Sequence, residues 1–594
     1  FTPTLIGRLR SSGGMRTRVN PPKPRFALAV GVIGHRPDRL PEDMRPRIAQ
    51  EIGETFEAIR TEAVAAHARH ADYFSTSAPK LIVVTALAEG SDRMATEAAL
   101  ANGFELEAPL PFPVDEYERD FDGPGAKNLF QGFVRRARAV LELEGDRTQP
   151  GKSYAAAGLV VLDNSDILIA VWDGGAAHGR GGTTELIHEA VRRGMPVIRV
   201  DATCENPPRL HWRGIEDRHT TPMHIEDHPA VALDQALAAA LDAQVRPPQN
   251  PAERQGLDRY FTERSRRITI RIEFPLLMVL MGVRWPRLGD IVLPRPEAPP
   301  EDRSAIQPPP TAIDRAFAWA DAVALRFAQD FRSAVITNFL VAAIAVLVGT
   351  LNLRYPWNAI ELALVFLLVL NAFIGHARRW HHRWIESREV AERLRMTAAM
   401  RAIATRALGP FGAAATWPAW YVRAIARESG LRSGRLDRDG LAGARESLLA
   451  LVRSQAAYHA ATATRFERLH DRLALAGQIT FVAALILAAG LFVAKAFDFT
   501  MTARFIRWTI VASASLPALA SASYGIRVIG DFDGSAKRSR RMKAQLDALA
   551  TTIETGSVSF ERLRDRAHKA SDVMLGDVAN WRLVVESREL EMPG

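Results

Sequence analysis

Three glycine-containing segments hold the residues of this chain best suited to binding a phosphate. They are residues 34–36, 88–93 and 179–185, and each lies between an apolar run and a segment with helical periodicity. Glycine lets backbone amides approach a phosphate closely, and a helix that starts after such a loop favours negative charge. Threonine hydroxyls can add donors or cap that helix, and Glu185 could accept a hydrogen bond from a ribose hydroxyl. The candidate ligand-binding residues are Gly34, His35, Arg36, Gly90, Ser91, Asp92, Arg93, Asp173, Gly174, Gly181, Gly182, Thr183, Thr184 and Glu185.

These loops also limit the chemistry that the chain could perform. None of them matches the GxxxxGK[ST] pattern of a P-loop or the GxGxxG dinucleotide fingerprint. His188 has no second ligand at i+4, so we expect His35, His178 and His188 to be solvated or capping residues, and we predict neither a metal nor a cofactor. No Ser-His-Asp order stands out, and no catalytic residue is predicted. Glu185 is a candidate only if the protein is an enzyme, in which case Arg180 or Arg93 would complete the catalytic pair.

Alternating apolar and helical patterns place the loops in an α/β domain at residues 26–205. Continuous rather than alternating apolar strands are typical of a parallel sheet covered on both faces, so we expect a Rossmann-like, doubly wound fold. Ligands bind such sheets beyond the carboxyl ends of the strands, which is where the loops fall. The predicted strands are 26–33, 81–87, 106–112, 167–172 and 195–200, and the predicted helices are 46–67, 94–101 and 184–193.

Four apolar segments in the C-terminal half are each long enough to cross a bilayer, since about 20 residues at ~1.5 Å each span a hydrocarbon core of ~30 Å. Short links join them into two predicted transmembrane hairpins, at 331–376 and 473–530, within an all-α region. Basic residues flank the outer ends. The positive-inside rule therefore places the N-terminus and the large domains in the cytoplasm, with the chain multi-pass in the cell inner membrane. Burial of the four helices in a soluble core is the alternative. The segments are 333–353, 357–374, 473–494 and 508–529.

Polar residues within these segments allow two interpretations. Asn338, Asn371 and Gln478 could form hydrogen bonds between helices, or they could line a pore. Pro517 lies in the fourth segment, which is rich in serine and alanine. Small residues permit close helix packing, so this segment is expected to face other helices or a pore rather than lipid.

The net charge of +9 first suggests binding to nucleic acid. The arginines cluster beside the apolar segments, however, which favours anchoring at anionic lipid headgroups, and no nucleic-acid partner is predicted. Cys204 is the single cysteine, so a disulfide framework within one chain is excluded and the soluble parts fit a reducing cytoplasm. The other expected regions are a disordered tail at 1–25, linkers and helices at 206–330, and cytoplasmic helices at 377–472 and 531–594.

Residues 31–36, 88–93 and 181–185 resemble the SLOG superfamily, a Rossmann-like group that includes the "lonely guy" phosphoribohydrolases and the ligand domain of melastatin-type TRP channels. The resemblance covers about residues 26–201. Residues 455–560 resemble the SLATT family of two-helix membrane effectors, and 320–405 looks like a diverged second copy. The resemblance implies an ADP-ribose-like or cyclic nucleotide as ligand. It also implies a pore-forming or channel-like effector, assembled as a homo-oligomer in the lipid bilayer of a prokaryotic antiviral defence system.

One departure from the family pattern bears on activity. The phosphoribohydrolases carry Gly-Gly-x-Gly-Thr-x-x-Glu, with the acid three residues after threonine, whereas Glu185 is two residues after Thr183. Neighbouring helix residues point about 100° apart, so this carboxylate need not reach a glycosidic bond. We therefore expect binding rather than hydrolysis. The alternatives are a membrane-tethered nucleotide N-glycosidase or phosphoribohydrolase, and a cation channel regulated by an ADP-ribose-like ligand.

Overall fold

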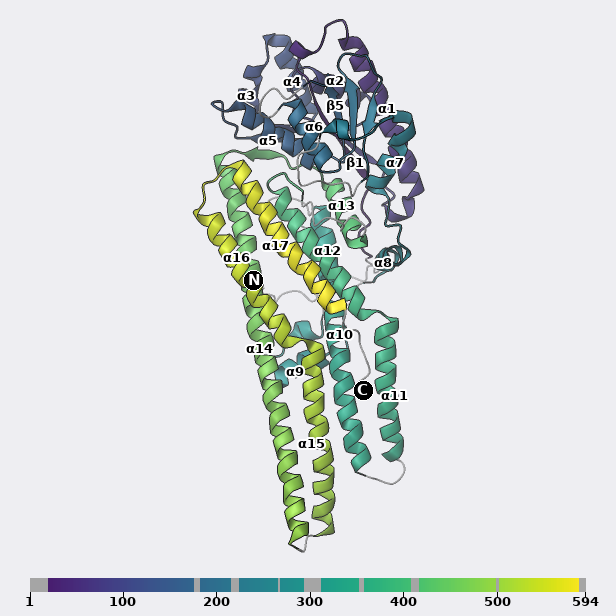
Figure 1. The fold of residues 1–594 in the computed structure, drawn as a ribbon, viewed down its shortest axis with the longest axis vertical. Coiled ribbons are helices and arrows are strands. Elements are labelled where there is room, and N and C mark those ends of the chain that lie inside the picture. Colours follow the sequence, from purple (N-terminus) through teal and green to yellow (C-terminus); the bar gives the residue numbers. More distant parts are fainter. Residues whose placement is uncertain are drawn as a thin grey trace, which may run out of the picture.

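The computed structural model shows an elongated molecule with an α/β domain at one end and long helices running away from it (Figure 1). The structure describes residues 20–175, 182–214, 224–264, 268–292, 311–351, 357–406, 416–497 and 502–586. Of the predicted disordered tail, residues 1–19 lie outside the described residues. The following segment is placed, because the Tyr421 hydroxyl donates a hydrogen bond to the carbonyl of Pro22 at 2.8 Å.

The α/β domain is built on one mixed sheet of nine strands in the order β8-β7-β6-β5-β1-β2-β3-β4-β9. Six strands and the distant β9 run parallel, whereas β7 and β8 are antiparallel, so the prediction of a purely parallel sheet is wrong at this edge. The sheet also continues past residue 205. The strands are β1 (Ala27–Gly34), β2 (Lys80–Val84), β3 (Glu105–Leu110), β4 (Ala139–Leu143), β5 (Ile167–Trp172), β6 (Val197–Asp201), β7 (Arg209–His211), β8 (Ala230–Ala232) and β9 (Gly434–Leu436).

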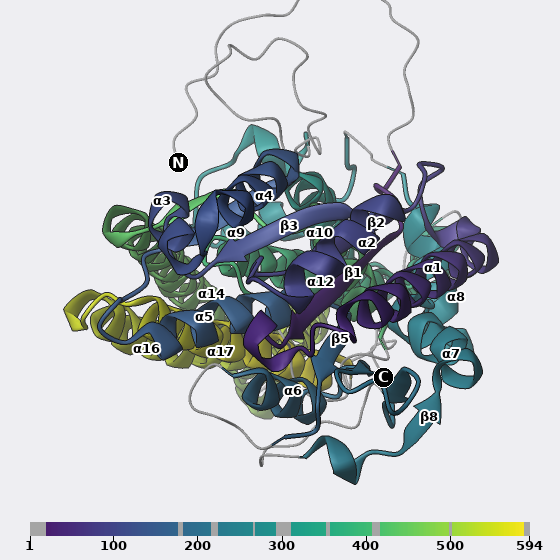
Figure 2. The same ribbon diagram turned by 90° about the horizontal axis from the view of Figure 1, so that it is seen from above.

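Helices cover both faces of the sheet, which explains why its strands are apolar throughout. Val30 of β1 packs into a core with Phe56, and its neighbour Ala29 packs into a second core with Ile187. Figure 2 shows α1 with α7 and α5 with α6 on opposite sides of β1 and β5. The helices of this domain are α1 (Arg45–Arg69), α2 (Ser91–Ala101), α3 (Val114–Tyr117), α4 (Gly123–Arg136), α5 (Pro150–Asp163), α6 (Thr183–Arg192) and α7 (Leu233–Val245).

Outside the sheet, the regular structure of the described chain is helical, and four of these helices are long and apolar enough to cross a membrane: α10, α11, α14 and α15. Helix α10 packs against α11 and α15, and α15 packs against α14, so α10 and α15 occupy the middle of a row of four (Figure 1). The helices are α8 (Pro251–Phe261), α9 (Glu273–Leu280), α10 (Ala312–Thr350), α11 (Trp357–Ala377), α12 (Trp380–Arg401), α13 (Trp417–Ser429), α14 (Arg438–Ala496), α15 (Ala503–Gly530), α16 (Phe532–Thr555) and α17 (Phe560–Glu586).

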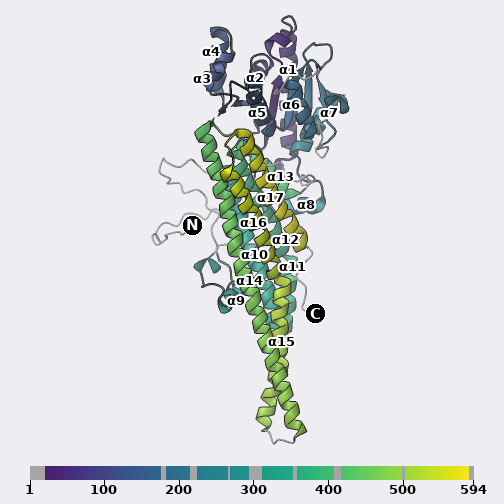
Figure 3. The same ribbon diagram turned by 60° about the vertical axis from the view of Figure 1, so that its left-hand side comes forward.

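Helix α14 has 59 residues and continues through the predicted boundary between 472 and 473. At ~1.5 Å per residue it is about 90 Å long, roughly three times a hydrocarbon core. Its N-terminal half packs against α16 and α17, and its apolar half pairs with α15 at the far end of the molecule (Figure 3). The soluble and apolar parts are therefore joined by continuous helix rather than by a linker.

The α/β domain and the helices also share a core and a strand. One cluster of buried residues runs from Phe26 at the sheet through Trp420 of α13 to Trp319 of α10. Strand β9, which lies between α13 and α14, pairs with β4 and extends the sheet. The two parts are therefore packed together rather than tethered.

Buried ion pairs add a polar connection at the amino-terminal edge of the sheet. Asp163, at the end of α5, accepts hydrogen bonds from Arg193 at 2.6 Å and Thr405 at 2.6 Å. It also accepts two from Arg564 of α17, at 2.9 and 3.1 Å. These positive neighbours more than offset burial and lower the pKa of Asp163. The loop before β5 is thus fixed to the last helix of the described chain.

Candidate functional site

The predicted ligand residues gather where the strand order changes direction. Strands β1 and β5 are neighbours, and the chain moves outward from them in opposite directions, towards β4 on one side and β6 on the other. Gly34 ends β1, Asp173 follows β5, and Ser91 begins α2 after β2. Such a switch point is where open α/β sheets bind their ligands.

Hydrogen bonds hold the loops against one another. The Ser91 backbone N–H and its Oγ both donate to the carbonyl of His35, at 3.2 and 2.9 Å. The Thr183 hydroxyl donates to the carbonyl of Gly34 at 3.1 Å. Residues from all three predicted loops therefore meet at one edge of the sheet, and the starts of α2 and α6 lie beside the end of β1.

Two glycines make this close approach possible. A Cβ on Gly34 would lie 2.3 Å from the Ser91 Oγ and 2.9 Å from the Cβ of Val171. Gly90 has φ +102°, and a Cβ there would lie 2.7 Å from the His35 carbonyl oxygen. Both positions exclude larger residues because the loops touch there, in addition to any need for backbone access to a phosphate.

His35 and Asp173 contact each other beside these loops. The His35 Nε2 lies 2.9 Å from Asp173 Oδ1, and the Arg39 guanidinium lies 2.7 Å from Asp173 Oδ2. Although burial opposes ionisation, hydrogen bonds from the Gly175 N–H and His35 and the charge of Arg39 hold the pKa of Asp173 at about 2. Burial lowers the pKa of His35 in spite of Asp173. The backbone N–H of Asp173 also donates to His35 Nε2, at 3.3 Å. Asp173 is consequently an ionised acceptor, suited to a hydroxyl group rather than to donating a proton.

Asp92 and Arg93 are turned into the protein instead of toward a ligand. The Asp92 carboxylate accepts hydrogen bonds from the Thr85 hydroxyl at 2.9 Å and the Ala88 N–H at 3.3 Å. The Arg93 guanidinium lies 4.1 Å from the centre of the Phe121 ring and donates to the carbonyl of Ala126 at 2.9 Å. These two side chains shape the loop after β2.

Arg36 and Glu185 are the exposed charged groups of the predicted set. Arg36 lies over the ring of Tyr154 at 4.9 Å, and the Tyr154 hydroxyl donates to Asp120 at 2.5 Å. Glu185 lies in the first turn of α6. The hydroxyl of the preceding residue, Thr184, donates a hydrogen bond to the Gly175 carbonyl at 3.1 Å. Gly174 is exposed with φ +85°, Gly182 precedes α6, and Gly181 lies outside the described residues.

Sequence patterns did not single out Arg39 or Tyr154. Arg39 lies in a short 3-10 turn after β1, and Tyr154 lies in α5, which was not predicted. Both reach the site only because the sheet brings these segments beside β1.

One group of side chains could hold a metal ion, although no metal site was predicted. Ligand atoms of His188, His224 and Glu226 lie within 4.8 Å of one another. Imidazole and carboxylate are ligands that Zn²⁺ accepts. The His224 side chain already accepts a hydrogen bond from the backbone N–H of Asp227, which leaves it one ring nitrogen. His35 lies apart from this group with Asp173, and His178 lies outside the described residues.

The polar residues of the apolar helices occupy different environments. The Asn371 amide donates to Asn338 Oδ1 at 2.6 Å and to the Ala334 carbonyl at 3.0 Å, which joins α11 to α10. Gln478 is exposed on α14, and Pro517 is half-buried within α15.

Comparison with known proteins adds no relative: no protein-family model matches this chain, and no curated protein or solved structure is significantly similar to it.

Proposed function

We propose that this protein is a nucleotide-sensing, ligand-gated membrane effector of the pore-forming or channel-like kind. The observation that carries the proposal is the meeting of three polar, glycine-containing loops at the switch point of the sheet, in a chain with four apolar helices of spanning length. The first feature supplies a site for a small ligand, and the second supplies a part that a bilayer can hold.

The chemistry of the switch point suits an ADP-ribose-like or cyclic nucleotide. A phosphate would lie near Gly34 and Gly90, at the start of α2 and α6, where helix N-termini favour negative charge. Arg36 supplies positive charge at the rim. The ionised Asp173 and the exposed Glu185 would accept hydrogen bonds from ribose hydroxyls.

In this proposal α10–α11 and α14–α15 form two transmembrane hairpins in the inner membrane of a prokaryotic cell. Basic residues at their α/β-domain ends favour a cytoplasmic sensor. Four helices per chain would enclose a pore only with further copies, so the effector would be a homo-oligomer. Opening it would dissipate ion gradients and arrest an infected cell, as the resemblance to SLOG and SLATT proteins implies for antiviral defence.

A ligand can shift the helices only if its affinity differs between closed and open arrangements. The shared core and the bonds of Asp163 supply the connection for such a shift. Helix α5 carries Tyr154 near the site and ends at Asp163, which is bonded to Arg564 of α17. A shift of α5 on ligand binding would therefore move the partner of Arg564.

The test is to follow thermal stability, nucleotide breakdown and ion flux in one panel of NAD-derived and cyclic nucleotides. We expect one nucleotide to stabilise the purified protein, to remain intact, and to release ions from proteoliposomes. The Gly34→Val variant should lose both the stabilisation and the ion release, and Gly53→Ala, a helix position with no atom within 4 Å of the added Cβ, should keep them. Saturating nucleotide without flux would refute the effector proposal, and breakdown that requires Glu185 would make the protein an enzyme.

A further inference from the structure

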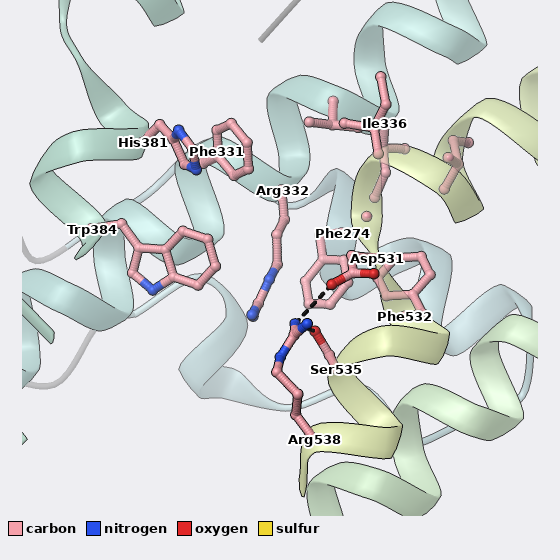
Figure 4. A pocket seen from close by; sticks show the side chains of 14 residues that line it. Phe274, Phe331, Arg332, Ile336, His381, Trp384, Asp531, Phe532, Ser535 and Arg538 are labelled. Atoms are coloured by element: carbon pink, nitrogen blue, oxygen red, sulfur yellow. Dashed lines mark hydrogen bonds and ion pairs between the residues drawn. The ribbon is translucent and has the colours of Figure 1, made fainter. Parts of the chain in front are cut away.

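A cavity lies far from the sheet, at the end of the apolar helices nearer the α/β domain. It has a volume of about 50 Å³ and is bounded by α9, α10, α12, α15 and α16 (Figure 4). Arg332 lies one residue before the first predicted apolar segment, and Arg538 lies shortly after α15 ends at Gly530. The cavity therefore lies where α10 and α12 meet α15 and α16.

Arg332 of α10 points into this cavity without a polar partner. Its guanidinium lies 5.2 Å from the ring centre of Phe274, 4.8 Å from that of Trp384 and 5.4 Å from that of Phe466. Within the described part of the chain it has no hydrogen bond and no ion pair. Aromatic faces attract the cation, but they satisfy none of the five N–H donors of a guanidinium. The donors are thus available to an acceptor that enters the cavity.

Arg538 of α16 faces the same space. Figure 4 shows the two guanidinium groups directed toward each other, with dashed lines from Arg538 only. Arg538 donates to Asp531 at 2.7 Å and to the Ser535 hydroxyl at 2.9 Å. One carboxylate thus faces two guanidinium groups, and the positive charge of Arg332 is left without a counter-ion.

The acids of the adjoining cavity do not supply that counter-ion. This space, of about 190 Å³, shares Arg332 and Arg538 with the first cavity and is also lined by Glu392 and Asp577. Glu392 is already held by Arg388 and Arg395. Burial raises the pKa of Asp577 in spite of Arg538. Together the two spaces leave room for an anion beside Arg332.

We propose that Arg332 and Arg538 bind a phosphate-type oxyanion that bridges the two pairs of apolar helices. Two guanidinium groups can hold separate oxygens of one phosphate by charge-assisted hydrogen bonds, which is the arrangement that arginine favours. Without the anion, the two like charges push α10 and α16 apart. With it, the same charges hold the helices together. The site stands on this geometry alone and does not depend on nucleotide sensing at the sheet.

The phosphate could come from solution or from a lipid headgroup, and two measurements on the full-length protein distinguish these sources. In the first, the protein in a neutral detergent is unfolded thermally in sodium phosphate and in sodium chloride of equal ionic strength. In the second, it is unfolded in nanodiscs of phosphatidylcholine with and without phosphatidylglycerol. Stabilisation by inorganic phosphate assigns the site to a soluble anion, and stabilisation by phosphatidylglycerol alone assigns it to a lipid.

Arg332→Gln is the deciding variant, with Arg541→Gln of the same helix as Arg538 as an exposed control. We expect Arg332→Gln to weaken the apparent anion affinity at least about tenfold and to unfold no earlier than the wild type when the anion is absent, because it removes an unpaired charge. Arg332→Lys should bind at intermediate affinity. The proposal is overturned if neither phosphate source stabilises the wild type, or if Arg332→Gln responds as the wild type does.

Discussion

The switch point of the sheet and the arginine cavity at the apolar helices both suit a phosphate, but they are built in opposite ways. At the switch point, glycine brings loops and helix starts together, and the charged side chains Asp92, Asp173 and Arg93 already bond to protein groups. At the cavity, helices meet through aromatic rings and one guanidinium has no partner. The first site is preorganised by its backbone. At the second site the Arg332 guanidinium has no counter-ion, and an anionic ligand would supply one. Four tests examine this contrast.

The largest effect is expected where the two regions are connected. Asp163→Asn removes the charge that Arg193 and Arg564 share, so Arg564 loses this buried anion, whereas Arg193 keeps its pair with Glu189. Breaking a buried pair in this way costs about 3–5 kcal/mol, measured by chemical unfolding. Asp547→Asn, which breaks a surface pair with Lys543, should cost less than about 0.5 kcal/mol. If both variants lost the same free energy of unfolding, the buried pairs of Asp163 would stabilise the protein no more than a surface pair does.

Gly34→Val tests the preorganisation of the switch point. The added atoms would collide with Ser91 and Val171, so we expect a loss of about 2–3 kcal/mol in the free energy of unfolding. Phosphate affinity at Arg332 should stay within about twofold, since distant sites behave independently. The contrast between the sites is contradicted if Gly34→Val lowers phosphate affinity at Arg332 as much as it lowers ligand affinity at the switch point.

The next test uses pH. Burial raises the pKa of Asp92 to about 7 in spite of its hydrogen bonds from Thr85 and Ala88. A carboxyl whose pKa is higher in the folded state takes up a proton on folding, so its contribution is full below about pH 4 and is lost as pH rises through 7. Asp92→Asn keeps both hydrogen bonds without titrating. It should therefore raise stability by about 1–2 kcal/mol at pH 8 and change it little at pH 4. Melting curves at the two pH values check the sign, and equal shifts would contradict it.

The smallest effects come from two hydroxyls, one at each site. Thr183→Val removes the hydrogen bond to the Gly34 carbonyl and should cost about 1 kcal/mol. Ser535→Ala removes the hydrogen bond that the Ser535 hydroxyl accepts from Arg538. Because Arg538 keeps its bond to Asp531, this loss should lower the free energy of unfolding by less than about 0.5 kcal/mol. Thermal unfolding of the two variants compares these losses of stability. A larger loss for Ser535→Ala than for Thr183→Val would contradict the contrast between the sites.

Much of the switch point could be predicted from sequence because its parts are local. An apolar run followed by glycine and a helix start identifies β1 with Gly34 and β5 with Asp173 within a few residues. The four apolar helices were predicted for the same reason, and their existence is confirmed. Their arrangement as membrane hairpins, and the ligand, stay predictions.

The missed features depend on contacts between distant segments. β4 alternates buried and half-buried residues instead of forming a continuous apolar run, and β9 is a strand only because it lies beside β4. Arg332 and Arg538 are about 200 residues apart and looked like the flanking charges of two separate apolar segments. No local pattern shows that both turn inward to one cavity.

Strand β9 sets a condition on how the chain is threaded. It is synthesised about 290 residues after β4, and α10 and α11 lie between them. If these helices cross a bilayer, the chain must cross an even number of times before β9, since β9 has to return to the compartment that holds β4. A molecule that inserted only one of the two would leave the edge of β4 open, with the unpaired amides that attract other chains. An error of membrane insertion would thus become visible as an incomplete sheet.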